Sequence, residues 1–308
     1  MPVARPRRLS LAVAVVAVLA LSACNDAESP SADPSAPTTA TGDAPAPVAP
    51  AVVTLVEPGA APRRVVALDV EEGHMETSTL ELTSTTSVDF MSSPPITVPM
   101  TIPFTSTVAD VTDDGVTVEV VYGKATVAGG GLRKDALDQA RKALGYLDGV
   151  TARVGYDRSG AVTSRDVEVG DDAPDVVGRI LEDVVSQGSA LAVAFPTEEI
   201  GVGARWKVAS AISVGGSKVG VVSTYRLTEL TDAGYAVSVR ATQVTEPGDT
   251  LAGKVIEGSS TSTGTVRGQT GLLGPAVARS STEGDTTVEV GGQRVRTTFE
   301  VTLRATTQ

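Results

Sequence analysis

The apolar and polar residues of this chain follow three different patterns along its length. An apolar run of thirteen residues, Leu9–Leu21, stands near the start, and a stretch rich in Pro, Ala, Ser and Thr extends to about residue 62. From Arg64 onward, apolar and polar residues alternate with a period of two, as in strands that bury one face. The pattern therefore predicts three parts, residues 1–23, 24–62 and 63–308, of which the last is a β-rich globular domain.

Strands are predicted where the alternation is sustained, and turns where Asp and Gly interrupt it. The most regular alternation is found in Ile96–Phe104, Val116–Tyr122, Trp206–Val214 and Phe299–Leu303. The sequences typical of tight turns are Thr112–Gly115, Asp157–Gly160 and Asp232–Gly234. Pro99 and Pro103 cannot donate a backbone hydrogen bond, so we expect their strand at a sheet edge.

Two stretches depart from this alternation and carry apolar residues every three or four positions, as an amphipathic helix does. The first is Leu132–Leu147. The second covers residues 171–185, with Asp171 or Asp172 as a cap and Pro174 in the first turn. The expected fold class is α+β and mostly β. It is one large curved antiparallel sheet, resembling half a barrel, with two amphipathic helices packed on one face.

The first residues have the layout of a secretory signal. Arg5, Arg7 and Arg8 precede the apolar run, which is shorter than the roughly 20 residues that cross a membrane. The run ends in Leu21–Cys24, which resembles the lipobox of bacterial lipoproteins. The resemblance implies cleavage after Ala23 and attachment of diacylglycerol to Cys24, and hence a lipid anchor on the extracytoplasmic face of the cell membrane. The alternative is an ordinary secreted protein with an incidental cysteine.

Composition narrows the choice of partners. Residues 24–62 hold many prolines, no aromatic residue and only acidic charges, so we expect a lipidated cysteine followed by a disordered tether. Removing residues 1–23 takes away three arginines and no acid, which leaves 22 basic and 37 acidic residues, a net charge of −15. Such acidity argues against nucleic acid as a partner. Cys24 is the only cysteine, so no disulfide is expected.

The segment Phe195–Trp206 carries a second resemblance. A proline, acidic residues, an Ile-Gly-Val-Gly turn and a tryptophan follow one another, as in an uncharacterised domain of actinobacterial lipoproteins, where Val is common at the position of Ile200. Val111–Val116 and Tyr225–Leu227 fit the same pattern. At the level of fold alone, the expected architecture is similar to the half-barrels of bacterial lipoprotein carriers and mycobacterial lipid-binding lipoproteins. The resemblance implies an apolar cavity beneath helices and fixes no activity.

Signals for catalysis or for a cofactor are weak. His74, the only histidine, stands among Glu71, Glu72 and Glu76, a combination that we interpret as a solvated turn and not as a metal site. Gly248–Lys254 matches the start of a phosphate-binding loop, but Val255 replaces the required Ser or Thr. We therefore predict no catalytic, metal-binding or cofactor-binding residue, no cofactor and no enzymatic activity. A hydrolase stays an alternative, because two carboxylates that are distant in the sequence can be brought together by the fold.

Glycines recur between Gly248 and Gly274, interleaved with Ser and Thr. In strands, glycine marks a bend or the close approach of another group. The first functional hypothesis is binding of an apolar or amphiphilic, lipid-like ligand. The alternative is a structural or adaptor envelope lipoprotein with a filled core and a protein partner of unknown identity. A cavity of roughly 300–1,000 Å³ would favour the first hypothesis.

Overall fold

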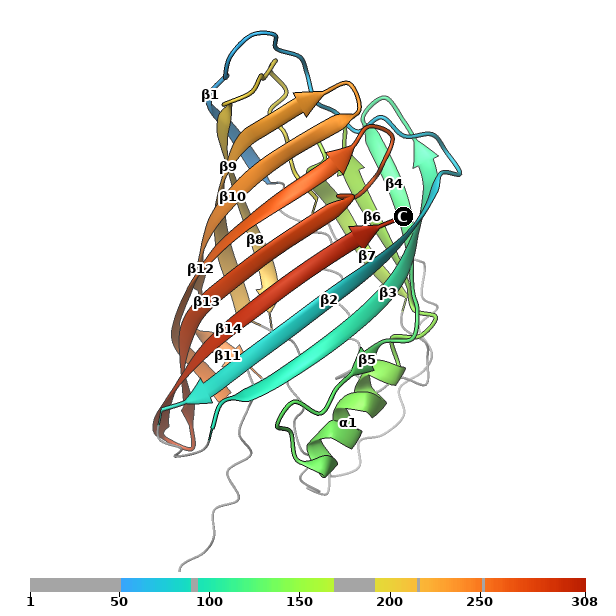
Figure 1. Ribbon diagram of the computed structural model, residues 1–308. Coiled ribbons are helices and arrows are strands. Elements are labelled where there is room, and N and C mark those ends of the chain that lie inside the picture. The colour runs from blue at the N-terminus through green and yellow to red at the C-terminus, as the bar shows by residue number, and fades with distance from the viewer. Residues whose placement is uncertain (1–50, 90–93, 169–191, 215–216, 251–252) are drawn as a thin grey trace, which may run out of the picture.

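One antiparallel sheet accounts for most of the protein (Figure 1). The computed structural model describes residues 51–89, 94–168, 192–214, 217–250 and 253–308. The elements of the first half are β1 Val52–Glu57, β2 Met75–Val88, β3 Ile96–Val111, β4 Gly115–Tyr122, β5 Thr126–Val127, α1 Lys134–Gly145, β6 Thr151–Asp157 and β7 Val162–Glu168. Those of the second half are β8 Arg205–Val214, β9 Ser217–Thr231, β10 Gly234–Thr245, β11 Gly248–Thr250, β12 Gly253–Gln269, β13 Val277–Val290 and β14 Gln293–Thr307.

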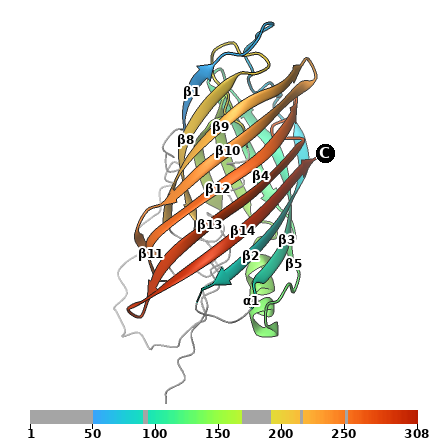
Figure 2. The same cartoon turned by 60° about the vertical axis from the view of Figure 1, so that its left-hand side comes forward.

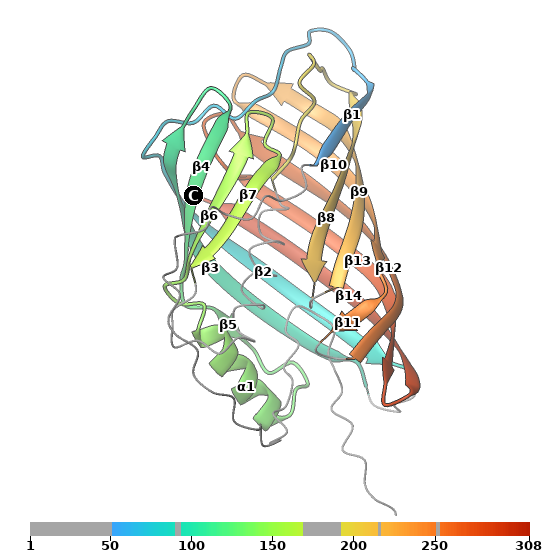
Figure 3. The same cartoon turned by 180° about the vertical axis from the view of Figure 1, so that it is seen from behind.

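The strand order is β1-β8-β9-β10-β12-β13-β14-β2-β3-β4-β6-β7, with β5 paired to β3 and β11 paired to β12. The sheet curls strongly, and its two ends, β1 and β7, do not pair within the described residues (Figures 2 and 3). The expectation of one large, curved and open antiparallel sheet is therefore confirmed. The predicted turns at Thr112–Gly115, Asp157–Gly160 and Asp232–Gly234 connect neighbouring strands.

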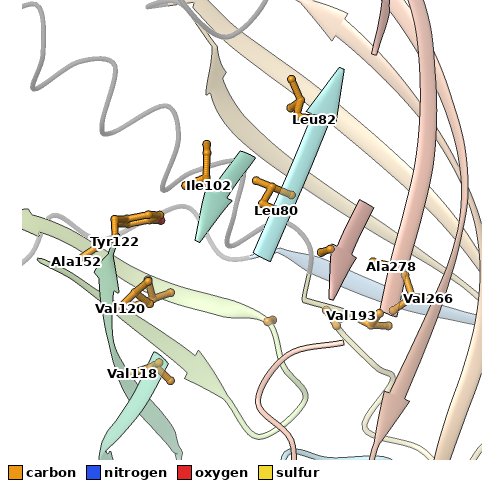
Figure 4. Packing of buried hydrophobic residues seen from close by; sticks show 14 of the residues in the cluster. Leu80, Leu82, Ile102, Val118, Val120, Tyr122, Ala152, Val193, Val266 and Ala278 are labelled. Atoms are coloured by element: carbon orange, nitrogen blue, oxygen red, sulfur yellow. The ribbon is translucent and has the colours of Figure 1, made fainter. Parts of the chain in front are cut away.

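The two faces of the sheet differ in polarity, as the period of two predicts. Leu80, Leu82 and Ile102 lie on the inner, concave face and are almost fully buried (Figure 4). Burying each such side chain contributes about 1.5–3 kcal/mol. The convex face carries charge, for example Glu81 and Arg304, whose side chains approach to 3.6 Å on adjacent strands. The hydrophobic core therefore lies inside the curve of the sheet.

The prolines of β3 correct one expectation. The strand lies between β2 and β4 and not at an outer edge of the sheet. However, β4 pairs with β3 only from Phe104 onward, beyond both prolines. The carbonyl oxygens of Pro99 and Pro103 accept hydrogen bonds from residues 128 and 123, at 3.0 and 2.8 Å. Since the N and O atoms of a residue in an antiparallel strand point to the same side, the missing N–H groups face this loop and leave the ladder to β2 intact.

The helical expectation is met only in part. α1 is the one helix within the described residues, and it lies beside β5 at the end of the sheet instead of across one face (Figure 1). Its buried side chains are Ala140 and Leu144. The second predicted helix, residues 171–185, falls outside the described residues. The sequence pattern identified the apolar stripe of α1, but a stripe does not specify which surface covers it.

The folded domain also begins earlier than the tether boundary at residue 62 suggested. β1 pairs in antiparallel register with β8, with Leu55 opposite Trp206. The sequence pattern did not predict this strand, because it lies between the proline-rich stretch and the two prolines Pro58 and Pro62. No helix within the described residues is both long and apolar enough to cross a membrane.

Candidate functional site

Two segments without regular secondary structure lie at the end of the sheet where β2 begins and β14 ends. Residues 58–74 connect β1 to β2, and residues 192–204 lead into β8. They bind each other through Arg64 and Ile200, which exchange two backbone hydrogen bonds of 3.0 and 2.9 Å. A side chain at Gly201 would place its Cβ only 1.8 Å from the carbonyl oxygen of Ala60. Glycine is required there because the two backbones approach so closely.

The same segments hold the β6–β7 turn. The amide of Leu68 donates to the carbonyl of Arg158 at 2.9 Å, and the amide of Phe195 donates to that of Ser159 at 2.8 Å. The guanidinium of Arg158 in turn donates to the carbonyl of Thr112 in the β3–β4 turn, at 2.6 Å. Loops, and not strand pairing, therefore connect the two sides of the open sheet at this end.

These loops line a solvent-open cavity of about 490 Å³, which we call the mouth cavity. Its apolar and aromatic lining includes Leu68, Tyr156, Phe195, Leu230, Tyr235 and Leu273. Its charged lining consists of Arg64, Asp69, Arg158 and Asp232. The volume lies within the range of roughly 300–1,000 Å³ typical of small-molecule sites.

Aromatic rings form one wall of the mouth cavity. Phe195 meets Tyr235 edge to face, with ring centroids 4.8 Å apart at 81°. Behind Phe195 lies the fully buried Trp206, which stacks on Tyr225 at 5.3 Å and 11°. Such ring pairs contribute about 0.5–1.5 kcal/mol beyond the area they bury. The segment from Phe195 to Trp206 thus supplies both the wall and its support.

Two tyrosines of this wall stay uncharged. Burial raises the pKa of Tyr235 to about 12, and nearby Tyr225 adds to the effect. Burial also raises the pKa of Tyr156 to about 12, although Arg165 counteracts part of the shift. Both phenols are therefore neutral at physiological pH, which keeps this part of the lining suited to apolar groups.

The charged groups of the mouth cavity lie at its outer rim. Arg64 forms an ion pair with Asp232 at 3.1 Å, and its guanidinium also donates to the carbonyl of Thr231. The side chain of Asp232 is fully exposed to solvent, and Asp69 is exposed as well. The arrangement combines an apolar interior with a polar, water-facing rim.

One wall of the mouth cavity is held by a buried acid that the sequence reasoning missed as a functional residue. Glu76, with 2% of its surface exposed, accepts hydrogen bonds from the backbone amides of Leu273 and Gly274 at 2.6 and 3.3 Å. His74 contacts the same carboxylate through Nε2 at 3.0 Å. The sequence contained a sign of this role. Glu76 is an even number of residues from Leu80 and Leu82 in β2, so its side chain faces the same, concave side of the sheet.

Some of the remaining predicted features lie within the described residues, and others lie outside them. Cys24, the predicted lipidation residue, and Ala23, the predicted cleavage residue, lie outside the described residues. His74 does lie in a turn, with its amide 3.1 Å from the carbonyl of Glu71. Of Gly248–Lys254, the described residues 248–250 and 253–254 pair as strands β11 and β12, and no helix follows them directly. The described part of the chain contains no group of three His, Cys, Asp or Glu side chains arranged to hold a metal ion.

Comparisons with known proteins add little. No protein-family model and no curated protein matches this sequence. Among solved structures, an outer membrane channel of Pseudomonas putida F1 aligns over 78% of this chain and 97% of its own, at 10% identity and a TM-score of 0.22. The outer membrane protein OmpT of Vibrio cholerae aligns over 76% and 99%, at 9% identity and a TM-score of 0.21. Similarities this low carry no functional argument.

Proposed function

We propose that this protein binds an apolar or amphiphilic, lipid-like ligand in the mouth cavity and catalyses no reaction on it. The observation that supports the proposal is a solvent-open cavity of about 490 Å³ with aromatic and aliphatic side chains in its lining. Within the described residues the cavity lies between loops at the end of the sheet, and the second helix that the sequence predicts above the ligand falls outside these residues. A filled core would instead have favoured the adaptor alternative.

The polarity of the lining indicates how such a ligand lies. Phe195, Tyr235 and Leu230 offer apolar contacts, whereas Arg64 and Asp232 stand at the water-facing rim. An amphiphile gains free energy by burying its chain, at about 0.8 kcal/mol per CH₂ group. Its polar head remains at the rim, because charged groups lose hydration when they are buried.

The cellular setting in the proposal comes from the N-terminal sequence. The lipobox-like Leu21–Cys24 supports a lipid anchor on the extracytoplasmic face of the membrane. The acidic and proline-rich residues 25–50 then act as a spacer. A ligand carried at the mouth would be a component of the cell envelope or a small molecule that reaches it.

Ligand binding is tested with the full chain carrying Cys24→Ala, so that no lipid anchor contributes. We expect native mass spectrometry to show co-purified amphiphile, and the apolar dye N-phenyl-1-naphthylamine to bind and be displaced by decanol. Leu230→Trp, which fills the cavity, should weaken dye binding by about tenfold or more, corresponding to about 1.4 kcal/mol. Val222→Trp, on the exposed face of the same strand, is the matched control. Absence of both co-purified amphiphile and dye binding would reject the proposal and favour the adaptor alternative.

A further inference from the structure

The β12–β13 loop, residues 270–276, forms one wall of the mouth cavity, and the side chain of Glu76 holds its middle. Gly271, Leu272 and Leu273 line the mouth cavity. The middle of the loop is anchored to β2 by the two amide hydrogen bonds that the carboxylate of Glu76 accepts, at 2.6 and 3.3 Å. Other hydrogen bonds secure the two ends of the loop: the Thr270 amide donates to the carbonyl of Ala233 at 3.0 Å, and the Thr307 hydroxyl donates to the carbonyl of Pro275 at 3.0 Å.

The carboxylate of Glu76 is suited to this task because of its charge. Hydrogen bonds to ionised groups are about twice as strong as neutral ones, and a buried carboxylate must be satisfied by donors. Glu76 receives two amide donors and, through Oε1, a contact with Nε2 of His74 at 3.0 Å. Replacing this carboxylate with a neutral amide removes the charge and weakens the hold on Leu273 and Gly274.

The titratable surroundings of Glu76 are few. His74 is the titratable side chain in contact with it, and Glu71 and Glu72 lie exposed in the turn that precedes β2. The β12–β13 loop contributes no titratable side chain. On the flanking strands, Asp110 is exposed in β3, four residues beyond Ser106, which pairs with Glu76, and Arg304 of β14 points to the convex face, where it pairs with Glu81. No cation other than His74 therefore contacts Glu76 within the described residues.

We infer that Glu76, supported by His74, is a latch that keeps the middle of the β12–β13 loop over the mouth cavity and thereby slows the release of ligand. This inference concerns the ligand exchange of the proposed site and rests on that function. Glu76 acts as a positioning residue, because it contacts the loop and not the ligand. While the carboxylate holds the loop, ligand dissociates slowly. Without the carboxylate the loop loosens, while the core of the sheet stays folded.

The test compares Glu76→Gln with Glu81→Gln in the full chain carrying Cys24→Ala. Glu81 lies on the same strand but on the convex face, where it pairs with Arg304. We expect amide hydrogen exchange of residues 271–274 to become at least tenfold faster in Glu76→Gln and to change less than twofold in Glu81→Gln. The dissociation rate of N-phenyl-1-naphthylamine should rise in parallel in Glu76→Gln and stay unchanged in Glu81→Gln.

Each outcome of this experiment decides something. Unchanged exchange of residues 271–274 in Glu76→Gln would overturn the latch. Faster exchange with an unchanged dye dissociation rate would show that the loop does not control the cavity, which also overturns the inference. A parent chain that binds no dye while its loop responds as expected rejects the proposed function and removes the ligand from the inference. If Glu76→Gln does not fold, His74→Gln, which should loosen the loop to a smaller extent, gives the same readouts.

Discussion

The indole nitrogen of Trp206 donates a hydrogen bond to the carbonyl oxygen of Ala194, 2.9 Å away, in a fully buried environment. This bond ties the first strand after residues 192–204 to the segment that carries Phe195. It therefore links the core of the sheet to the aromatic wall of the mouth cavity. Trp206 is the only tryptophan of the chain, and its position is structural.

Replacing Trp206 with Phe should destabilise the protein. The change removes the donor for the Ala194 carbonyl and leaves a cavity beside Tyr225, which we expect to cost about 2–4 kcal/mol in the free energy of unfolding. Urea unfolding followed by circular dichroism measures the loss. Val222→Ala, on the exposed face of β9, should change the free energy by less than about 0.5 kcal/mol. A loss below about 1 kcal/mol for Trp206→Phe would contradict the structural role of the bond.

Gly268 and Tyr235 form a second testable pair, opposite each other on β12 and β10. A Cβ atom at Gly268 would lie 2.3 Å from the ring of Tyr235. Gly268→Ala should therefore cost about 1–3 kcal/mol through the displaced ring. In the double variant with Tyr235→Leu the added cost of Gly268→Ala should shrink, which a double-mutant cycle measures. Additive costs would show that the ring does not press on Gly268.

The buried tyrosines predict a loss of stability at alkaline pH. The pKa of Tyr235 is raised to about 12 in the folded protein, whereas an unfolded tyrosine titrates at about 10. A raised folded-state pKa gives stability that is complete below pH 10 and is lost as the pH rises from about 10 to about 12. Tyr235→Phe, which cannot ionise, should lose less stability over this interval than the parent chain. Urea unfolding between pH 8 and pH 11.5 decides this, and equal losses would contradict the assigned cause.

Cys24→Ala should release the protein from the membrane. The lipobox-like Leu21–Cys24 predicts that a thioether-linked diacylglycerol on Cys24 holds the mature chain at the bilayer. Fractionation of cells that express the parent and variant chains measures this, with Ser29→Ala in the spacer as a control that leaves the motif unchanged. Equal membrane association of all three chains would show that the anchor lies elsewhere.

Local patterns predicted the strands and turns well, because the period of two is set by the burial of one sheet face. The alternation in Phe299–Leu303 and the turns at Thr112–Gly115 and Asp232–Gly234 are all present in the structure. The position of β3 within the sheet was predicted incorrectly. Pro99 and Pro103 lack a hydrogen-bond donor only on the side of β3 that faces away from β2. β4 does not extend along this part of β3, and the sequence does not reveal where the pairing of β3 with β4 begins.

The mouth cavity depended on contacts between residues far apart in the chain. Glu76 and Leu273 are separated by 197 positions, and Arg64 and Asp232 by 168. No spacing rule connects such pairs. The parity of Glu76 in β2 placed a charge on the apolar face, but the two amides that satisfy it belong to a loop with no charged or otherwise distinctive side chain.

The sequence by itself determined the predicted signal and anchor motif at Leu21–Cys24, the β-rich class and the inward face of each strand, because these depend on residues that are neighbours in the chain. Only the tertiary structure decided that the sheet stays open, that loops 58–74 and 192–204 meet at one end, and that Glu76 holds the β12–β13 loop over a cavity. The physical reason is that closure of these long loops is driven by the burial of apolar surface they share, and this surface exists only once the strands have assembled.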